Sequence, residues 1–319
     1  MAQPQLYENK VWIDGCFDFT HHGHSGAILQ AKRTIPRDKR DGSVLICGVH
    51  NDADIEHNKG GRPVMQEQER YEHTQRNRWC DVVVKDAPYV TDPAVLDSYG
   101  CKYVVHGDDI TTDANGEDCY QQMKDAGRFQ VVKRTEGVST TDIIGRILRN
   151  DTVASGNSQG IDHEKLVLYS TGKHGYEPWC WVFGSGFADV VVEGVGSAQD
   201  ENWVVVREPD GFDLFNVGHI NELKALKDAG KRVCCSLSVD SGSVDSGSSV
   251  YMTLEERCLS VLSCDVVDAV MLGTPPSSTL PSSADICLTN VSLKKEIVQR
   301  INDNRDHYIE RNMKKAGGL

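Results

Sequence analysis

The chain has 319 residues, of which 39% are hydrophobic and 25% are charged, and its formal net charge is −13. This composition is typical of a globular protein long enough for two domains, and it argues against a disordered or membrane-embedded protein. The acidic balance argues against nucleic acid or an anionic membrane surface as the main partner, although a local basic pocket for phosphates is compatible with it.

The cysteines and the first residues indicate a reducing compartment. The eleven cysteines are scattered, contain no Cys-x-x-Cys pair and lie mostly in apolar runs such as 44–49, so we expect reduced thiols and no structural zinc site. Residues 1–9 have neither the basic nor the apolar segment of a signal peptide. We therefore expect a cytoplasmic protein without an integral membrane segment.

Strands and helices alternate in the first half of the chain. The run Val11-Trp12-Ile13 predicts a buried strand over 10–15 that ends in a glycine turn, and apolar residues at helical spacing predict a helix over 23–33. The same signals predict further strands at 44–49, 82–84, 103–106 and 130–133, and further helices at 66–78, 93–99 and 141–149. This alternation indicates a parallel sheet in a first domain of residues 1–150.

The second half of the chain repeats two motifs of the first half in the same order. Residues 211–219 repeat residues 16–24, and Glu255-Glu256-Arg257 repeats Gln68-Glu69-Arg70, which indicates an internal duplication. We therefore expect an α/β protein with two tandem Rossmann-like domains built on parallel sheets. The second domain, residues 201–319, is expected to be degenerate and to follow a linker region, residues 151–200, which begins rich in Ser, Gly, Asn and Asp.

The motif His21-His22-Gly23-His24 lies where a predicted strand gives way to a helix. A helix N-terminus binds phosphate through its free N–H groups, and Gly23 allows a nucleotide to come close to the backbone. His21 and His24 share one helical turn, where both imidazoles can donate hydrogen bonds to phosphate oxygens. A metal site or a merely polar helix start is the alternative interpretation of this motif.

A second candidate phosphate site is the segment 134–141, again a strand followed by a glycine loop and a helix start. Ser139 or Thr140 could serve only as a helix cap, but Arg134 beside hydroxyl groups and free N–H groups is typical of a polyphosphate cradle. Lys59, in the glycine-containing loop 58–61, is a third candidate phosphate ligand. Taken alone, a solvated loop lysine is the more common case.

Together these motifs resemble those of the cytidylyltransferase family. The resemblance runs almost continuously over residues 10–149, and besides the two loops it includes Gly15-Cys16-Phe17-Asp18, Gln68-Glu69-Arg70-Tyr71, Ala87-Pro88-Tyr89 and the segment 105–109. The duplicated architecture resembles the branch that acts on phosphoethanolamine. The choline-specific branch carries one such domain followed by a basic amphipathic helix, which we do not find in this sequence.

The resemblance implies transfer of CMP from CTP to phosphoethanolamine, giving CDP-ethanolamine and pyrophosphate in phosphatidylethanolamine biosynthesis. Mg²⁺ would accompany CTP without a dedicated metal site on the protein. The substrate phosphate would attack the α-phosphorus directly, so the protein would position reactants and stabilise charge. The implied catalytic residues are His21, His24, Lys59 and Arg134; the implied nucleotide-binding residues are Gly15, Phe17, Asp18, Gly23, Thr135, Gly137, Ser139 and Thr140; and the implied substrate-binding residues are Tyr89, His106 and Asp109.

The second half departs from this pattern. Asn216 replaces the first histidine, no lysine corresponds to Lys59, and no loop like 134–141 precedes residues 294–296, whereas His219 is retained. An asparagine donates a hydrogen bond but supplies no positive charge, so a triphosphate would be poorly compensated there. We predict that this half is catalytically silent.

Alternatives to this function remain open at this stage. The same chemistry on phosphocholine or glycerol 3-phosphate, or an adenylyl transfer from ATP, differs only in pocket shape. A regulatory pseudo-enzyme would be expected to lose the histidines or the basic residues, which the first half keeps. Either a homodimer or pairing of the two domains within one chain is compatible with the duplication.

Overall fold

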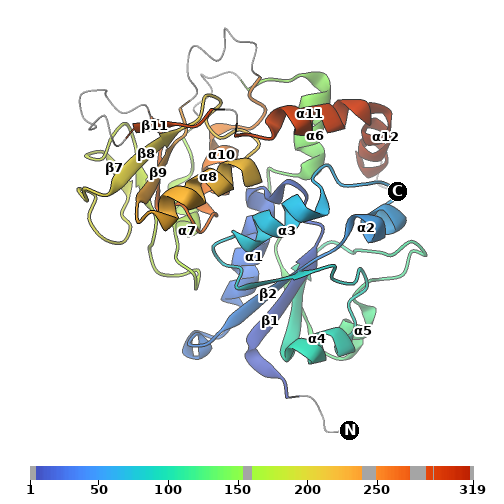
Figure 1. The fold of residues 1–319 in the computed structure, drawn as a ribbon. Helices are drawn as coiled ribbons and strands as arrows, with labels where there is room; N and C mark the ends of the chain where they lie inside the picture. Colours follow the sequence, from blue (N-terminus) through green and yellow to red (C-terminus); the bar gives the residue numbers. More distant parts are fainter. Residues whose placement is uncertain (1–4, 154–159, 239–248, 274–284, 290, 317–319) are drawn as a thin grey trace. The chain divides into compact units, whose positions relative to one another are not determined.

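The computed structural model describes residues 5–153, 160–238, 249–273, 285–289 and 291–316, which fold around two separate β-sheets (Figure 1). Each sheet belongs to its own compact unit. The first unit comprises Met1–Gly137 and Lys173–Gly175, and the second comprises Val138–Gly172 and Tyr176–Leu319. The sequence repeat ends the first domain near residue 150, whereas the structural division falls at residue 137.

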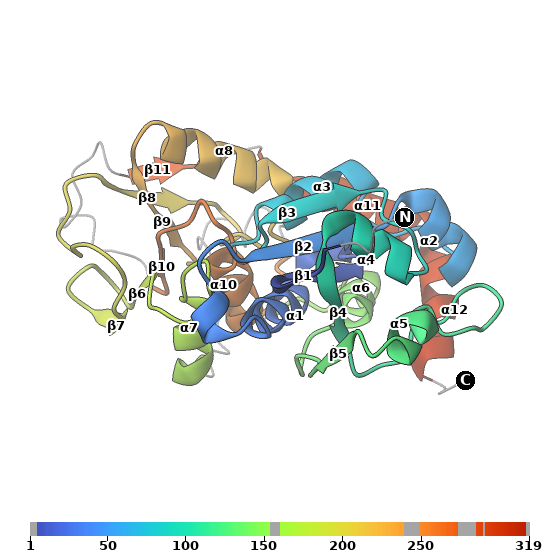
Figure 2. The ribbon, with the colours of Figure 1, turned by 90° about the horizontal axis from the view of Figure 1, so that it is seen from below.

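Five strands form the sheet of the first unit, in the order β3-β2-β1-β4-β5 and with every pair parallel (Figure 2). The strands are β1 (Tyr7–Gly15), β2 (Val44–Val49), β3 (Val82–Lys85), β4 (Cys101–Gly107) and β5 (Phe129–Val132). The strand order reverses at β1, which pairs with β2 on one side and β4 on the other. In parallel α/β sheets, ligands bind beyond the carboxyl ends of the strands at such a switch point.

The helices of the first unit confirm most of the predicted alternation. They are η1 (Asp18–Thr20), α1 (His22–Arg33), η2 (Arg37–Lys39), α2 (Asp52–Lys59), α3 (Glu67–Gln75), α4 (Pro93–Tyr99) and α5 (Gln121–Asp125). Helices α2 and α5 were not expected. The placement of Lys59 in a loop was wrong, because Lys59 is the last residue of α2 and Gly60 caps the helix with a left-handed backbone (φ 70°).

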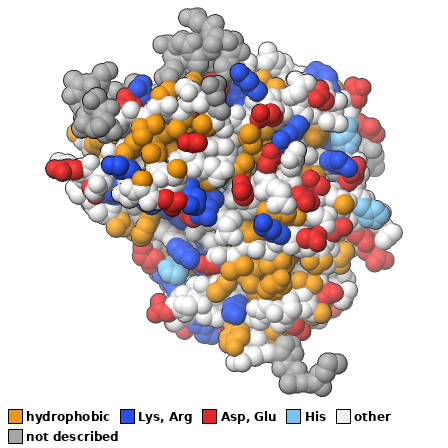
Figure 3. Space-filling view, in the orientation of Figure 1, with side chains coloured by type: hydrophobic (Ala, Val, Ile, Leu, Met, Phe, Trp, Pro, Cys, Tyr) orange, Lys and Arg blue, Asp and Glu red, His pale blue; other side chains and the backbone are white. Residues whose placement is uncertain are grey.

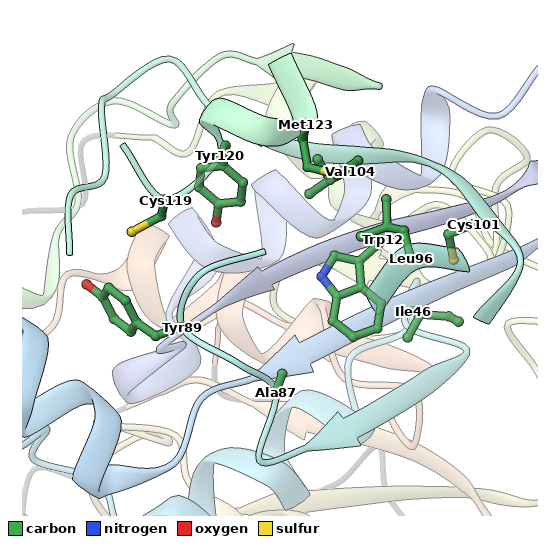
Figure 4. Packing of buried hydrophobic residues seen from close by; sticks show 10 residues of the cluster. All are labelled: Trp12, Ile46, Ala87, Tyr89, Leu96, Cys101, Val104, Cys119, Tyr120 and Met123. Carbon is green, nitrogen blue, oxygen red and sulfur yellow. The ribbon is translucent and has the colours of Figure 1, made fainter. Parts of the chain in front are cut away.

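The core of the first unit lies against β1, β2 and β4. Trp12 and Val104 are fully buried, and they belong to one cluster with Ile46, Leu96 and Met123 (Figure 4). Because a parallel strand is covered on both faces, the buried run Val11 to Asp14 in β1 includes residues of both orientations. This packing holds the end of β1 rigid at the point where the histidine motif follows.

Six strands form the sheet of the second unit, in the order β11-β8-β9-β10-β6-β7. They are β6 (Trp181–Phe183), β7 (Val190–Val192), β8 (Trp203–Arg207), β9 (Arg232–Ser236), β10 (Ala269–Met271) and β11 (Asp285–Cys287). All pairs are parallel except β6 with β7. The order β11-β8-β9-β10 matches β4-β1-β2-β3 of the first unit, which agrees with the internal duplication, and β6 and β7 extend the sheet beyond the β10 edge.

The linker expected over residues 151–200 is wrong for most of that range. It contains α7 (His163–Tyr169) as well as β6 and β7, and so supplies two strands of the second sheet. The short apolar runs of β6 and β7 pack at a sheet edge that a four-stranded repeat would leave unpaired. The Ser-, Gly- and Asp-rich tract 240–248 and the segment 275–283 lie outside the described residues.

The remaining helices of the second unit are α6 (Thr140–Arg149), α8 (Val217–Asp228), α10 (Leu254–Leu262), α11 (Lys294–Asp303) and α12 (Arg305–Ala316). Helix α6 ends the first sequence repeat, yet it packs on α11 and α12 within the second unit. Its Arg146 forms a bidentate ion pair with Glu256 (Nη2–Oε1 2.6 Å, Nη1–Oε2 2.7 Å) and donates to Tyr251 O. These contacts account for the division at residue 137.

The visible face of the molecule carries interspersed acidic and basic side chains (Figure 3). None of the helices within the described ranges combines the length and the hydrophobicity that a bilayer span requires.

Candidate active site

The turn between β1 and α1 holds an unusual backbone. Phe17, Phe19 and Thr20 have positive φ angles of 49°, 64° and 38°, a conformation that non-glycine residues rarely adopt and that clusters at functional sites. His21 follows as the N-cap of α1, and its Nδ1 accepts a hydrogen bond from Gly23 N at 3.1 Å. The strained turn therefore delivers the histidine motif directly at the helix N-terminus, as predicted.

His21 and His24 form a stacked pair at this helix end. Their ring centroids are 4.1 Å apart with an interplanar angle of 23°, and the Phe17 ring meets the His24 ring edge-on at 5.8 Å. His21 is buried, whereas His24 is partly exposed. Two imidazoles held one helical turn apart at the positive end of α1 form a compact set of donors for phosphate oxygens.

The charges of two cationic residues act on His24. Burial lowers the pKa of His24 to about 3, and the charges of Lys59 and Arg134 lower it further. The predicted cationic residues Lys59 and Arg134 are therefore brought together with His24 in the first unit, and His24 is a neutral donor at physiological pH. The Lys59 ammonium also lies 6.0 Å from the centroid of the Tyr89 ring.

Asp18 supports the site through the backbone. Its carboxylate accepts hydrogen bonds from Val64 N (3.0 Å) and Met65 N (2.9 Å), just before α3. Arg70, on α3, donates to Met65 O, to Cys16 O (2.7 Å) and to His50 O (2.8 Å). These bonds tie the segment before α3 to the ends of β1 and β2, and we call this set of bonds, made by Asp18 and Arg70, the frame of the site. The role that the structure gives Asp18 is to hold the frame together. Contact with a nucleotide stays a prediction for Gly15, Phe17, Asp18 and Gly23.

The predicted substrate residues lie at the ends of the strands. Tyr89 is buried, and its ring centroid is 5.0 Å from that of His50. His106, on β4, lies with its ring 4.6 Å from the ring of Tyr120. Asp109 is exposed. Tyr89 and His106 thus border aromatic partners, while Asp109 is available to solvent.

Asp14 is a buried acid that the sequence analysis missed. It lies in β1 with 3% exposure and accepts hydrogen bonds from Trp12 Nε1 (2.7 Å), from the Thr91 hydroxyl and from the Tyr120 hydroxyl. Burial, together with the charge of Asp14, raises the pKa of Tyr120, which stays a phenol that donates to the carboxylate. Trp12, Tyr89 and Tyr120 are members of the same cluster (Figure 4), so this carboxylate lies among aromatic rings.

The predicted phosphate loop spans the division between the units. Thr135 and Gly137 belong to the first unit and Ser139 and Thr140 to the second. Ser139 is the N-cap of α6: it accepts from Asp142 N (3.1 Å) and donates to Asp142 Oδ2 (2.6 Å). The capping alternative is therefore observed for Ser139, and contact of these four residues with pyrophosphate stays a prediction.

The second unit repeats the frame around the site. Asp213 accepts from Tyr251 N (3.0 Å) and Met252 N (2.9 Å), as Asp18 does from Val64 N and Met65 N. Arg257 donates to Met252 O, Gly211 O and Leu237 O, as Arg70 does to its three carbonyls. Positive φ angles also recur at Phe212 and Leu214. The duplication thus extends to individual hydrogen bonds.

The residues at the helix end differ between the units. Asn216 is the N-cap of α8, in the position that His21 has in α1. The ring of His219 therefore stacks on Phe215 rather than on a second histidine, with centroids 5.6 Å apart and an interplanar angle of 6°. Both Asn216 and His219 are fully buried. The second unit therefore keeps the frame without the exposed imidazole of the first.

No group of three or more His, Cys, Asp or Glu side chains arranged to hold a metal ion occurs within the described part of the chain. The groups nearest His24 are cationic or neutral, which suits a triphosphate rather than a bare cation.

The parallel sheet with a histidine-bearing helix at its switch point is an arrangement suited to nucleotidyl transfer, and residues 12–146 match the family model described as cytidylyltransferase-like. The chain is 46% identical to ethanolamine-phosphate cytidylyltransferase of Saccharomyces cerevisiae, covering 98% of both chains. It is 36% identical to ethanolamine-phosphate cytidylyltransferase of Mus musculus, covering 85% of this chain and 71% of the mouse protein. The chain therefore belongs to the ethanolamine-phosphate cytidylyltransferase family.

Choline-phosphate cytidylyltransferase A of Mus musculus is 42% identical over 151 residues, which cover 47% of this chain and 40% of that protein. The similarity to this choline enzyme is thus confined to about half of the chain, whereas the similarity to the yeast ethanolamine enzyme includes both repeats.

Proposed function

We propose that this protein transfers CMP from CTP to phosphoethanolamine, giving CDP-ethanolamine and pyrophosphate. The observation that carries the proposal is the stacked pair His21 and His24 at the N-terminus of α1, with Lys59 and Arg134 close enough to affect the pKa of His24. The family to which the chain belongs supports the same reaction.

The reaction is a displacement at phosphorus. A phosphate oxygen of phosphoethanolamine forms a bond to the α-phosphorus of CTP, the bond from that phosphorus to the bridging oxygen breaks, and pyrophosphate leaves with the electron pair. Negative charge accumulates on the phosphate oxygens in the transition state. The N–H groups of His21 and His24 and the positive end of α1 would stabilise that charge without a proton transfer, because His24 is neutral.

Lys59 and Arg134 would supply the positive charge that the imidazoles lack. Both residues are exposed, so a triphosphate could reach them from solvent, and their positive charges would attract it. Thr135, Gly137, Ser139 and Thr140 would complete the pyrophosphate site through hydroxyl and backbone donors.

Asp14 and the rings around it favour a cationic acceptor. A buried carboxylate with aromatic neighbours attracts an ammonium group by charge and by cation–π interaction, and Tyr89 and His106 lie close to these neighbours. Glycerol 3-phosphate carries no positive charge and would gain nothing from Asp14. A primary ammonium donates three hydrogen bonds where the quaternary ammonium of phosphocholine donates none, which favours phosphoethanolamine.

A direct assay tests the function. Product formation from MgCTP should be measured with phosphoethanolamine, phosphocholine and glycerol 3-phosphate in parallel, and with MgATP as the alternative donor. We expect CDP-ethanolamine to form with the highest kcat/KM. A higher kcat/KM with either other acceptor would overturn the substrate assignment, and no product from any pair would overturn the proposed function.

Location and assembly are part of the same proposal. The net charge of −13 and the absence of a spanning helix within the described ranges support a cytoplasmic enzyme bound at most peripherally to the endoplasmic reticulum. Alkaline extraction of membranes should release all of it. Light scattering separates the two assemblies that the duplication allows: pairing of the two domains within one chain would give the mass of one chain, whereas a homodimer would give twice that mass.

A further inference from the structure

The frame of the second unit surrounds a cation that belongs to the chain itself. Lys294, the first residue of α11, lies with its Nζ 2.8 Å from Asp210 Oδ2 and 2.9 Å from Asp213 Oδ2. Lys294 is 7% exposed and Asp213 is 1% exposed. Although burial opposes its charge, the two aspartates raise the pKa of Lys294. The ammonium is therefore a permanent, internal partner of the residue that corresponds to Asp18.

Near this cation the second unit carries the acids Glu208 and Asp210 at positions where the first unit has Ile13 and Gly15. Asp210 aligns with Gly15 when residues 211–219 are matched to 16–24. Glu208, in the same turn, accepts from Asp210 N and Phe212 N, both at 2.9 Å. A triphosphate that entered here would meet carboxylates whose neutralising cation is already engaged, and like charges at short range are repelled.

The segment before α11 is fastened to the N-terminus of α8. Asn216 Oδ1 accepts from Gly218 N (3.0 Å) and from Leu293 N (3.2 Å), and Asn216 Nδ2 donates to Ser292 Oγ (3.3 Å). A Cβ added to Gly218 would lie 1.8 Å from Val291 O, so the backbone of the segment is packed against the helix end. The residue that replaces the first histidine is thus the anchor of this segment.

The anchored segment has a partial counterpart in the loop 134–141 of the first repeat, which the sequence analysis did not find. Val291-Ser292 repeats Val138-Ser139, and each pair precedes a ten-residue helix, α11 and α6 respectively. The histidine that the second repeat retains, His219, has no exposed surface. An imidazole that solvent does not reach cannot contact a nucleotide unless the surrounding segment moves.

We propose that the segment Val291–Lys294 closes the nucleotide frame of the second unit, so that the full chain binds a single CTP, in its first unit. The closure rests on the proposed function only in taking CTP as the nucleotide. In the second unit, the internal cation Lys294 then stabilises the frame that corresponds to the nucleotide site of the first unit.

Binding stoichiometry and hydrogen exchange test the proposal together. Calorimetric titration of the full chain with MgCTP should give one site per chain. Hydrogen exchange of peptides that contain 214–220 and 291–297 should be slow and unchanged by saturating MgCTP, whereas peptides that contain 19–26 should be further protected. Two CTP sites per chain would overturn the proposal. So would new protection by CTP of the second unit's peptides, 214–220 and 291–297. If no CTP binds, the proposed function fails, and slow exchange at 291–297 still decides whether the segment is closed.

Adjacent lysines give a matched pair of variants. Lys294→Met removes the internal cation and leaves Asp210 and Asp213 buried without it, so exchange at 291–297 should accelerate by roughly tenfold or more. Lys295, the next residue, is exposed, and Lys295→Met should exchange as the wild type does. If Lys294→Met does not fold, Lys294→Arg keeps the charge and should give an intermediate rate. Wild-type exchange in Lys294→Met, or in Lys294→Arg where that variant is the one that folds, would refute the closure.

Discussion

Replacing His24 by alanine should show most clearly which of the two repeats carries catalysis. His24 is partly exposed, stacked on His21 and neutral, because burial, Lys59 and Arg134 lower its pKa to about 3. It therefore offers one N–H donor to the charge that develops on the phosphate oxygens. Loss of one such donor typically lowers kcat by about 10²–10³, equivalent to about 2.7–4 kcal/mol of transition-state stabilisation, and we expect His24→Ala to fall in that range.

His219→Ala is the matched control. His219 has no exposed surface; its ring stacks on Phe215 and its Nδ1 accepts from Asn216 N at 3.2 Å. The change should lower the free energy of unfolding by about 1–3 kcal/mol through lost packing and a lost cap bond, while kcat stays within about twofold of the wild type.

The assay for both variants is the initial rate of CDP-ethanolamine formation at saturating MgCTP and phosphoethanolamine, below the unfolding temperature of each variant. Ring resonances of His24, assigned by their loss in His24→Ala, should not titrate between about pH 5 and pH 8 in the free enzyme. Wild-type kcat in His24→Ala, or an equal loss in His219→Ala, would refute the assignment of catalysis to the first unit. Titration of His24 near its ordinary value would refute its neutral state.

Three further changes test individual features. Asp14→Asn should raise the KM for phosphoethanolamine by roughly 10–100-fold through loss of the negative charge that attracts the ammonium group, while the KM for CTP changes little; equal effects on both substrates in initial-rate kinetics would contradict an ammonium site. Burial raises the pKa of Glu208 from 4.5 to about 7, so the folded state binds this proton more tightly than the unfolded chain does, and the stability it contributes is present below about pH 4.5 and lost as the pH rises through 7. Glu208→Gln should therefore flatten that pH dependence and raise stability at pH 8 in urea unfolding; an unchanged slope would contradict the raised pKa. Arg70→Met removes the donor to Met65 O, Cys16 O and His50 O and should lower the stability of the first unit by roughly 3–5 kcal/mol, which calorimetry would detect; an unchanged unfolding midpoint would show that the frame does not depend on Arg70.

Elements with a strong local pattern were predictable from the sequence. The apolar run 44–49 predicted β2 with its observed bounds. The helix predicted over 93–99 is α4, and the structure shows local signals at its ends: Asp92 is the N-cap, Pro93 is in the first turn and Gly100 is the C-cap. Helix α2 was missed because Ile55 is its one buried residue. Its caps, Asn51 and Gly60, were the signal that could have found it and placed Lys59 at a helix end.

Long-range contacts account for what the sequence could not show. Asp14 accepts from Thr91 and Tyr120, which are 77 and 106 residues away in the chain, so a single aspartate at a strand end gave no sign of a buried acid. The three-residue strands β6 and β7 are too short for a periodicity of two to stand out. The histidine motif was predictable because strand, turn and helix start follow one another directly in the chain.

The position of helix α6 decides whether the chain can be cut into two fragments, one for each repeat. A fragment cut at the end of the first repeat, near residue 150, would retain α6 but leave Arg146 without Glu256 and without the helices that pack beside it. A fragment cut at residue 137 would lose Ser139 and Thr140 instead. Neither cut therefore separates the two repeats cleanly, because the second repeat supplies the packing partners of a helix that the first repeat encodes.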